Sequence, residues 1–166
     1  MFSKPITLRL RDVRARALGA LARLRWLPPL CARIAVGVLF ASTGWGKVHH
    51  LEKVIQYFQT LHVPLPALNA PLVAWSELIC GSLIVVGLVT RLATVPLMIS
   101  MVVALLTAKA GTIHGLVDLV GQDELDYVVL LVYLAVEGAG ALSLDAVIAR
   151  SLDRSGAPVG RDGYAA

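Results

Sequence analysis

The sequence has few of the residues from which redox and nucleotide sites are built. It contains two cysteines, Cys31 and Cys80, which do not form a CxxC pair, and it has no glycine-rich nucleotide loop and no haem-ligand pattern. We therefore expect no catalytic motif and no redox cofactor of the chain's own. Any electron transfer would need a bound quinone or a partner subunit.

Charge is scarce as well, and apolar residues take its place. Charged residues make up 16% of the chain and hydrophobic residues 57%, and the mean hydropathy is +0.75. Four apolar segments, 28–46, 71–89, 92–108 and 125–143, are long enough to cross a hydrocarbon core about 30 Å thick. Because the run 92–108 has no charge on any face, a soluble bundle is excluded. The sequence predicts an all-α integral membrane four-helix bundle.

The chain divides into three parts by composition. Residues 1–27 are predicted to be a basic amphipathic cytoplasmic tail on an anionic membrane face, 28–146 a four-span membrane domain, and 147–166 a disordered cytoplasmic tail. Nothing around the basic tail forms a globular binding surface, so nucleic acid is not an expected partner.

The distribution of positive charge predicts the orientation. Most Lys and Arg residues lie in the two tails, whereas the first and third loops carry only Lys47, Lys53 and Lys109. Both termini are therefore expected in the cytoplasm, with these loops on the outer side. Apolar residues at helical spacing over 52–62 predict a short amphipathic helix at the outer interface.

Two glutamates lie inside predicted spans, where an unpaired carboxylate costs several kcal/mol. Glu137 and Arg33 each lie roughly 9 Å from the cytoplasmic ends of their helices, at 1.5 Å per residue. We therefore predict a structural ion pair between them.

Glu77 lies near the outer surface, within reach of Lys47 and Lys109, and it shares a helix face with Gly81. These four residues are the candidate ligand-binding residues, because an acid at this depth can exchange a proton as a quinone or another polar-headed ligand binds. Two alternatives stay open: the charge pairs only hold the helices in register, or a glutamate is protonated and hydrogen-bonded to a neighbour.

All four histidines, His49, His50, His62 and His114, fall in the outer loops. Imidazoles on one membrane face could bind copper or zinc, with Asp118 or Glu52 as further ligands. Because the spacing matches no metal signature, these residues are weak candidates and a metal site is not the favoured interpretation.

Three stretches together resemble the DoxX family of small four-helix membrane proteins. They are "RIAVGVLFASTGWGK", "VPLPALNAPLVAWSELICGSLIVVGLVTRLATVPLM" and "ELDYVVLLVYLAVEGAGALSLD", and they cover about residues 30–146. The resemblance implies a bacterial inner-membrane location. Members are described as subunits of thiosulfate:quinone oxidoreductase or terminal quinol oxidase systems, and others as membrane anchors of redox-stress complexes.

The expected function is thus a quinone-associated or anchoring subunit of an inner-membrane redox system. Its partners would be the lipid bilayer, other membrane or redox subunits, or a second copy of the chain, and its ligand would be a bound quinone. The alternative is a small transporter in which Glu77 and Glu137 carry a proton or substrate.

Overall fold

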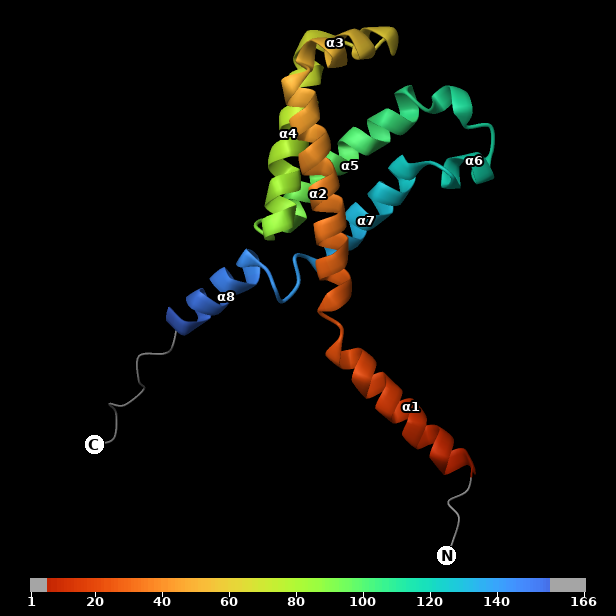
Figure 1. Ribbon diagram of the computed structural model, residues 1–166, viewed down its shortest axis with the longest axis vertical. Helices are drawn as coiled ribbons and strands as arrows, with labels where there is room; N and C mark the ends of the chain where they lie inside the picture. Colours follow the sequence, from red (N-terminus) through yellow and green to blue (C-terminus); the bar gives the residue numbers. More distant parts are fainter. Residues whose placement is uncertain (1–5, 156–166) are drawn as a thin grey trace, which may run out of the picture.

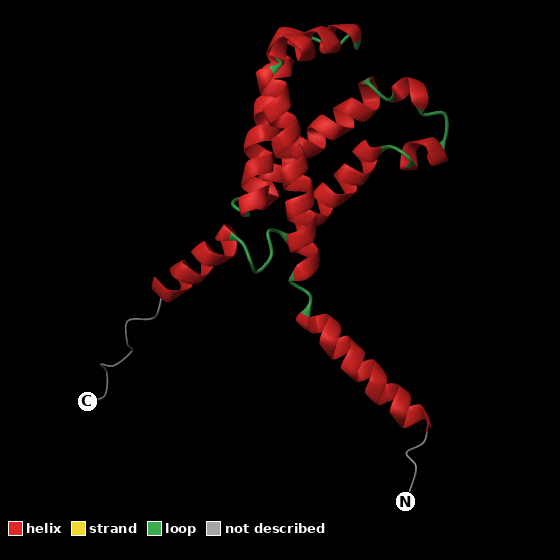
Figure 2. Ribbon diagram, in the orientation of Figure 1, coloured by secondary structure: helices red, strands yellow, loops and turns green. Residues whose placement is uncertain are grey.

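The structure is a computed structural model that describes residues 6–155, and within this range every regular element is helical (Figure 2). In chain order the elements are α1 (Ile6–Arg23), α2 (Leu27–His49), α3 (Leu51–Thr60), α4 (Pro66–Val86), α5 (Thr90–Thr107), the 3-10 turn η1 (Ala110–Thr112), α6 (Leu116–Val120), α7 (Asp123–Glu137) and α8 (Leu144–Ser155). The predicted all-α class is confirmed.

Three helices are long and apolar enough to cross a membrane: α2 with 23 residues, α4 with 21 and α5 with 18. The fourth predicted span, 125–143, is shorter than expected, because α7 has 15 residues and ends at Glu137. The next residue, Gly138, has a φ of 82°, which a residue with a side chain rarely adopts. Residues 138–143 therefore form an irregular segment rather than the last turns of a span.

The long helices form two antiparallel pairs (Figure 1). Helix α2 lies along α4, and α5 lies along α7. Helix α3 and the short α6 lie at one end, which we call the loop end; α1 and α8 leave from the opposite end, which we call the tail end. Both described ends of the chain thus lie on the same side of the bundle.

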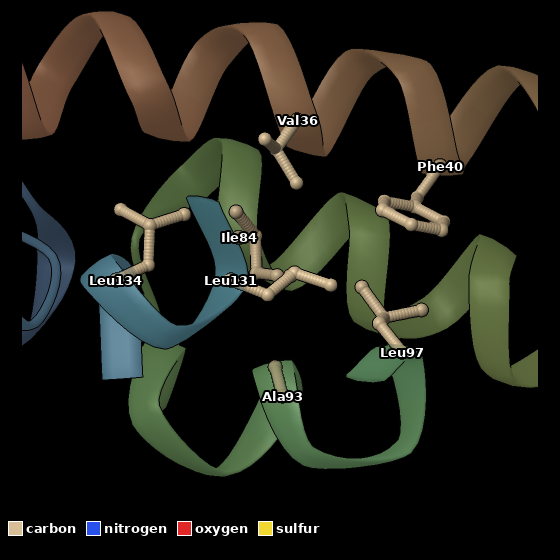
Figure 3. Packing of buried hydrophobic residues seen from close by; sticks show 7 residues of the cluster. All are labelled: Val36, Phe40, Ile84, Ala93, Leu97, Leu131 and Leu134. Atoms are coloured by element: carbon tan, nitrogen blue, oxygen red, sulfur yellow. The ribbon is translucent and has the colours of Figure 1, made fainter. Parts of the chain in front are cut away.

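One apolar cluster joins the two pairs (Figure 3). It contains Val36 and Phe40 from α2, Ile84 from α4, Ala93 and Leu97 from α5, and Leu131 and Leu134 from α7, each at most 5% exposed. Side chains on the outside of the same helices are also apolar: Leu92, Ile99 and Leu106 of α5 are 60–72% exposed. Such a surface is unfavourable in water and suits hydrocarbon.

The flanking segments correct one expectation and agree with another. Residues 147–166 were expected to be disordered, but α8 continues to Ser155, because Leu144, Val147, Ile148 and Leu152 recur at helical spacing. The basic tail forms α1, and the outer amphipathic helix predicted over 52–62 is α3. Residues 1–5 and 156–166 of the predicted tails lie outside the described residues.

Candidate functional site

The Glu77 carboxylate forms a buried ion pair between α2 and α4. The residue is 1% exposed, and Lys47 Nζ lies 2.5 Å from its Oε1 and 2.6 Å from its Oε2. Lys47 lies in the last turn of α2, at the loop end, and its side chain extends along the helix to the acid. The lysine pairs with a carboxylate whose burial without a partner would be costly.

Close packing of the two helix backbones makes this contact possible. A Cβ at Gly44 would lie 2.7 Å from Leu78 Cα, and a Cβ at Gly81 would lie 2.9 Å from the carbonyl carbon of Phe40. Small residues of this kind allow membrane helices to approach until their backbones touch. Gly81, predicted as part of the site, therefore acts here through packing: its missing side chain lets α4 press against α2.

Two hydroxyl groups complete the surroundings of the carboxylate. Thr43 Oγ1 donates to Oε2 at 3.2 Å, and Ser100 Oγ of α5 donates to Oε1 at 3.4 Å. No sequence pattern assigned a role to Thr43, although it lies one turn before Lys47 on the same helix. Ser100 was recognisable only as a small residue of its span, since nothing in the sequence indicates which helix it faces.

The pair is asymmetric in its accessibility. Glu77 is enclosed, whereas the Lys47 side chain is 32% exposed. An ammonium group has three N–H donors and no acceptor, so a lysine that holds two carboxylate oxygens can still donate to a third atom. The arrangement can therefore present one fixed, charged donor to a carbonyl oxygen at the edge of the bundle.

Lys109, the other predicted partner of Glu77, is placed elsewhere. Its Nζ lies 3.5 Å from Glu124 Oε1. Lys109 follows the end of α5 and therefore lies close to the first turn of α7, which contains Asp123, Glu124 and Asp126. Lys109 therefore pairs with Glu124 at the start of α7 and not with Glu77.

The structure does not bring Arg33 and Glu137 together as predicted. Arg33 donates to the backbone carbonyls of Ala139 at 2.8 Å and Leu142 at 2.6 Å. Because α7 stops at Glu137, these carbonyls have no helical partner and accept from the guanidinium instead. Glu137 is exposed and has no hydrogen-bond or ion-pair partner among residues 6–155.

A second polar cluster at the tail end was assigned no function from the sequence. The Asp145 carboxylate of α8 accepts from the backbone N–H groups of Val89 at 2.8 Å and Thr90 at 3.3 Å. These are the donors that the start of α5 leaves free, so an acid from a distant helix acts as the cap. Because Asp145 and Thr90 are 55 residues apart in the sequence, no local sequence pattern indicates this helix cap.

The histidines show no common centre. In the described part of the chain, no group of three or more His, Cys, Asp or Glu residues is placed to hold a metal ion. His49 Nδ1 lies 2.9 Å from the Trp45 carbonyl oxygen, and the two rings lie 4.3 Å apart. His49 is thus held against its own helix.

Comparisons with known proteins agree with this fold. The DoxX family matches residues 29–110. The "Uncharacterized membrane protein Rv3486" of Mycobacterium tuberculosis is 30% identical over 143 residues, which are 78% of this chain and 88% of the relative. The "Putative oxidoreductase CatD" of Bacillus subtilis is 33% identical over 118 residues, 70% of this chain and 83% of the relative.

A third relative, the "Inner membrane protein YphA" of Escherichia coli, is 31% identical over 123 residues, 70% of this chain and 86% of the relative. No solved structure matches the chain. The apolar helices, the family match and these relatives together establish that the chain is an integral membrane protein and belongs to the DoxX family.

Proposed function

We propose that the chain is a quinone-associated subunit of an inner-membrane redox system, with the Lys47–Glu77 pair at the quinone headgroup. The observation that carries the proposal is the asymmetry of the pair: a buried carboxylate fixes a lysine that is 32% exposed. A quinone carbonyl needs a donor of this kind, and a chain whose sequence predicts no redox cofactor of its own could take part in electron transfer through such a ligand.

Two further features support the proposal. The pair lies in the loop-end half of an apolar bundle, where a ligand with a polar ring and an apolar tail can place both parts. In addition, one relative is named "Putative oxidoreductase CatD", and another is named an inner membrane protein. If the chain only anchors other subunits of the same system, the Lys47–Glu77 pair would serve only to hold α2 against α4.

Quinone binding can be measured with the tryptophans of the chain itself. Trp45 and Trp75 each lie two residues from a member of the pair, and both are about half exposed, at 59% and 49%. We expect a short-chain ubiquinone, titrated into the purified protein in lipid nanodiscs, to quench tryptophan fluorescence in a saturable manner.

The variant that tests the site removes both charges. Lys47→Met alone leaves Glu77 buried without a partner and destabilises the fold, whereas Lys47→Met combined with Glu77→Leu leaves an apolar contact. We expect the double variant to fold and to bind the quinone about tenfold or more weakly, since a hydrogen bond from a charged group contributes about 1.5–3 kcal/mol. Lys109→Met, a lysine at the same end, is the matched control and should bind normally.

Unchanged, saturable quenching in the folded double variant would contradict the role of the pair. Quenching that never saturates in the wild type would indicate partition of quinone into lipid alone, which would favour the anchoring role. The transporter alternative has less support, because between Glu77 and Glu137 the helices contribute the apolar residues Ile84, Leu131 and Leu134 rather than polar ones.

A further inference from the structure

The tail end of the bundle contains a hollow of about 470 Å³, open to the surface and distant from the Lys47–Glu77 pair. Its walls are residues 89–92 at the start of α5, residues 137–140 after α7, and the first residues of α8. The irregular course of residues 138–143 keeps it open, because a continued helix would occupy this space.

Three groups that line the hollow have capacity for a ligand. Thr90 is 1% exposed, and its hydroxyl has no hydrogen-bond partner among the described residues, which is costly for a buried polar group. The Glu137 carboxylate is exposed and equally without a partner in the described chain. Arg91 uses one nitrogen to donate to the Val136 carbonyl at 3.1 Å, which leaves further N–H donors.

Two of these groups, Arg91 and Glu137, carry opposite charges and lie close together in the fold. The Arg91 guanidinium lies against Gly138, since a Cβ built there would be 3.2 Å from Arg91 Nε, and Glu137 is the preceding residue. Asp145 also borders the hollow, but its oxygens already accept from the backbone of α5. A ligand that fits must offer an anionic group to Arg91 and an N–H-bearing cation to Glu137.

The hollow opens beside lipid-facing surface. Leu92 belongs to its wall and is 70% exposed at the start of a membrane-capable helix, and Val89 is 44% exposed. An apolar rim of this kind is unnecessary for a water-soluble solute, whereas an acyl chain needs it. The tail end also lies where α2, α4 and α5 reach the membrane surface, which is the level of lipid headgroups.

We infer that this hollow is a binding site for the headgroup of a zwitterionic phospholipid with a primary ammonium group, of the phosphatidylethanolamine type. The ammonium group donates to Glu137, the phosphate accepts from Arg91, and the Thr90 hydroxyl pairs with a headgroup oxygen at the buried end. The acyl chains then lie along Leu92 and the outer face of α5.

The inference is tested by native mass spectrometry of the purified protein, titrated in mild detergent with lipids of identical acyl chains. We expect phosphatidylethanolamine to bind more tightly than phosphatidylcholine, whose quaternary ammonium has no N–H, and than phosphatidylglycerol, which has no cation. Glu137→Gln should weaken phosphatidylethanolamine binding about tenfold, which corresponds to about 1.4 kcal/mol, and should not weaken phosphatidylglycerol binding. This selective loss separates a lost ammonium contact from a damaged fold.

Thr90→Val keeps the shape of the side chain and removes only the hydroxyl. We expect it to weaken phosphatidylethanolamine binding by roughly two- to tenfold, the effect of one neutral hydrogen bond. Thr107→Val at the other end of α5 and Glu52→Gln on α3 are the matched controls and should bind as the wild type does.

Three results would overturn the inference: equal affinity for the three lipids, a preference that survives both Glu137→Gln and Thr90→Val, or displacement of the lipid by free phosphoethanolamine at micromolar concentration. The last result would show that the site recognises a soluble zwitterion without the help of acyl chains.

Discussion

Buried charge is satisfied in two different ways in this protein. Glu77 is neutralised by a side chain of opposite charge and two hydroxyl groups, whereas Arg33 donates to the free carbonyls of Ala139 and Leu142. In a membrane bundle both arrangements lower the cost of placing a charge in hydrocarbon, although Arg33 Nε has no hydrogen-bond partner among the described residues. Only the first leaves one partner accessible, which is why we place the proposed ligand there.

Stability should depend strongly on the Lys47–Glu77 pair. We expect Lys47→Met to lower the free energy of unfolding by about 3–5 kcal/mol, because it leaves the Glu77 carboxylate buried without a partner. Glu77→Leu should cost less, because Lys47 is 32% exposed and its ammonium group can turn toward the membrane surface. The double variant should be clearly more stable than Lys47→Met alone. Thermal unfolding in detergent, followed by circular dichroism, measures all three variants.

The Lys109–Glu124 pair provides the control for this cycle. Its side chains are 38% and 18% exposed, so the same cycle should give an interaction of about 1 kcal/mol or less. Additive effects at Lys47 and Glu77 would mean that the two charges do not stabilise each other.

The pairs show what the sequence could and could not predict about the site. Lys47 was predictable because charge is scarce, a lysine side chain is long, and Glu77 lies at a matching depth. The Arg33–Glu137 pair was wrong because depth was judged from an uninterrupted helix over 125–143. Because Gly138 ends α7, Glu137 lies outside the bundle, and backbone carbonyls after the helix become available to Arg33. Neither consequence can be predicted by matching the charges and depths of side chains in the sequence.

At the scale of the helices, the contact of α2 with α4 decides the geometry of the site. Gly44 faces the backbone of Glu77 and Leu78, and Gly81 faces the backbone of Phe40 and Ala41. Because backbone atoms cannot rotate away as a side chain can, an added Cβ must push the helices apart. Lys47 would then reach Glu77 less well.

Gly44→Ala and Gly81→Ala should therefore each destabilise the protein by about 1–3 kcal/mol, the usual cost of overpacking. Gly46→Ala is the matched control on α2, since a Cβ there meets nothing within 4 Å. Detergent thermal unfolding compares the three variants. Because alanine is the better helix former, a Gly44→Ala protein as stable as Gly46→Ala would show that the helices do not touch at this crossing.

The start of α8 is joined to the start of α5 by Asp145, which caps Val89 and Thr90 and whose own N–H donates to the Gly87 carbonyl at 3.0 Å. We expect Asp145→Ala to cost about 0.5–2 kcal/mol, as for the loss of a helix cap, and to increase hydrogen exchange of the amides at 89–90 and 138–147. Asp118→Ala, which removes a cap-like contact to the His114 amide at the loop end, should leave exchange at the tail end unchanged. Wild-type exchange in Asp145→Ala would argue against this junction.

At the scale of the whole molecule, the order of the three long apolar helices α2, α4 and α5 was the predictable part, because a membrane span needs a long apolar run. The tilt of the α5–α7 pair away from α2 and α4 toward the loop end (Figure 1) was not, since it depends on which small and large side chains meet across the core. The direction of α8 was not predictable either, because no pattern in the sequence indicates which part of the bundle its amphipathic face contacts.

The orientation of the bundle in the membrane can be tested by labelling its two ends. Helices α1 and α8 leave from one end, and α3 and α6 lie at the other, so we expect both described ends of the chain to face the same compartment. The excess of Lys and Arg in the tails favours the cytoplasm for that compartment. In a background with Cys31→Ala and Cys80→Ala, we expect Gln59→Cys on the exposed face of α3 to react with an impermeant maleimide in intact bacteria. Ala20→Cys on α1, equally exposed, should react only after the membrane is permeabilised. The opposite labelling pattern would invert the protein, placing the Lys47–Glu77 pair in the cytoplasmic half and the tail-end hollow in the outer leaflet.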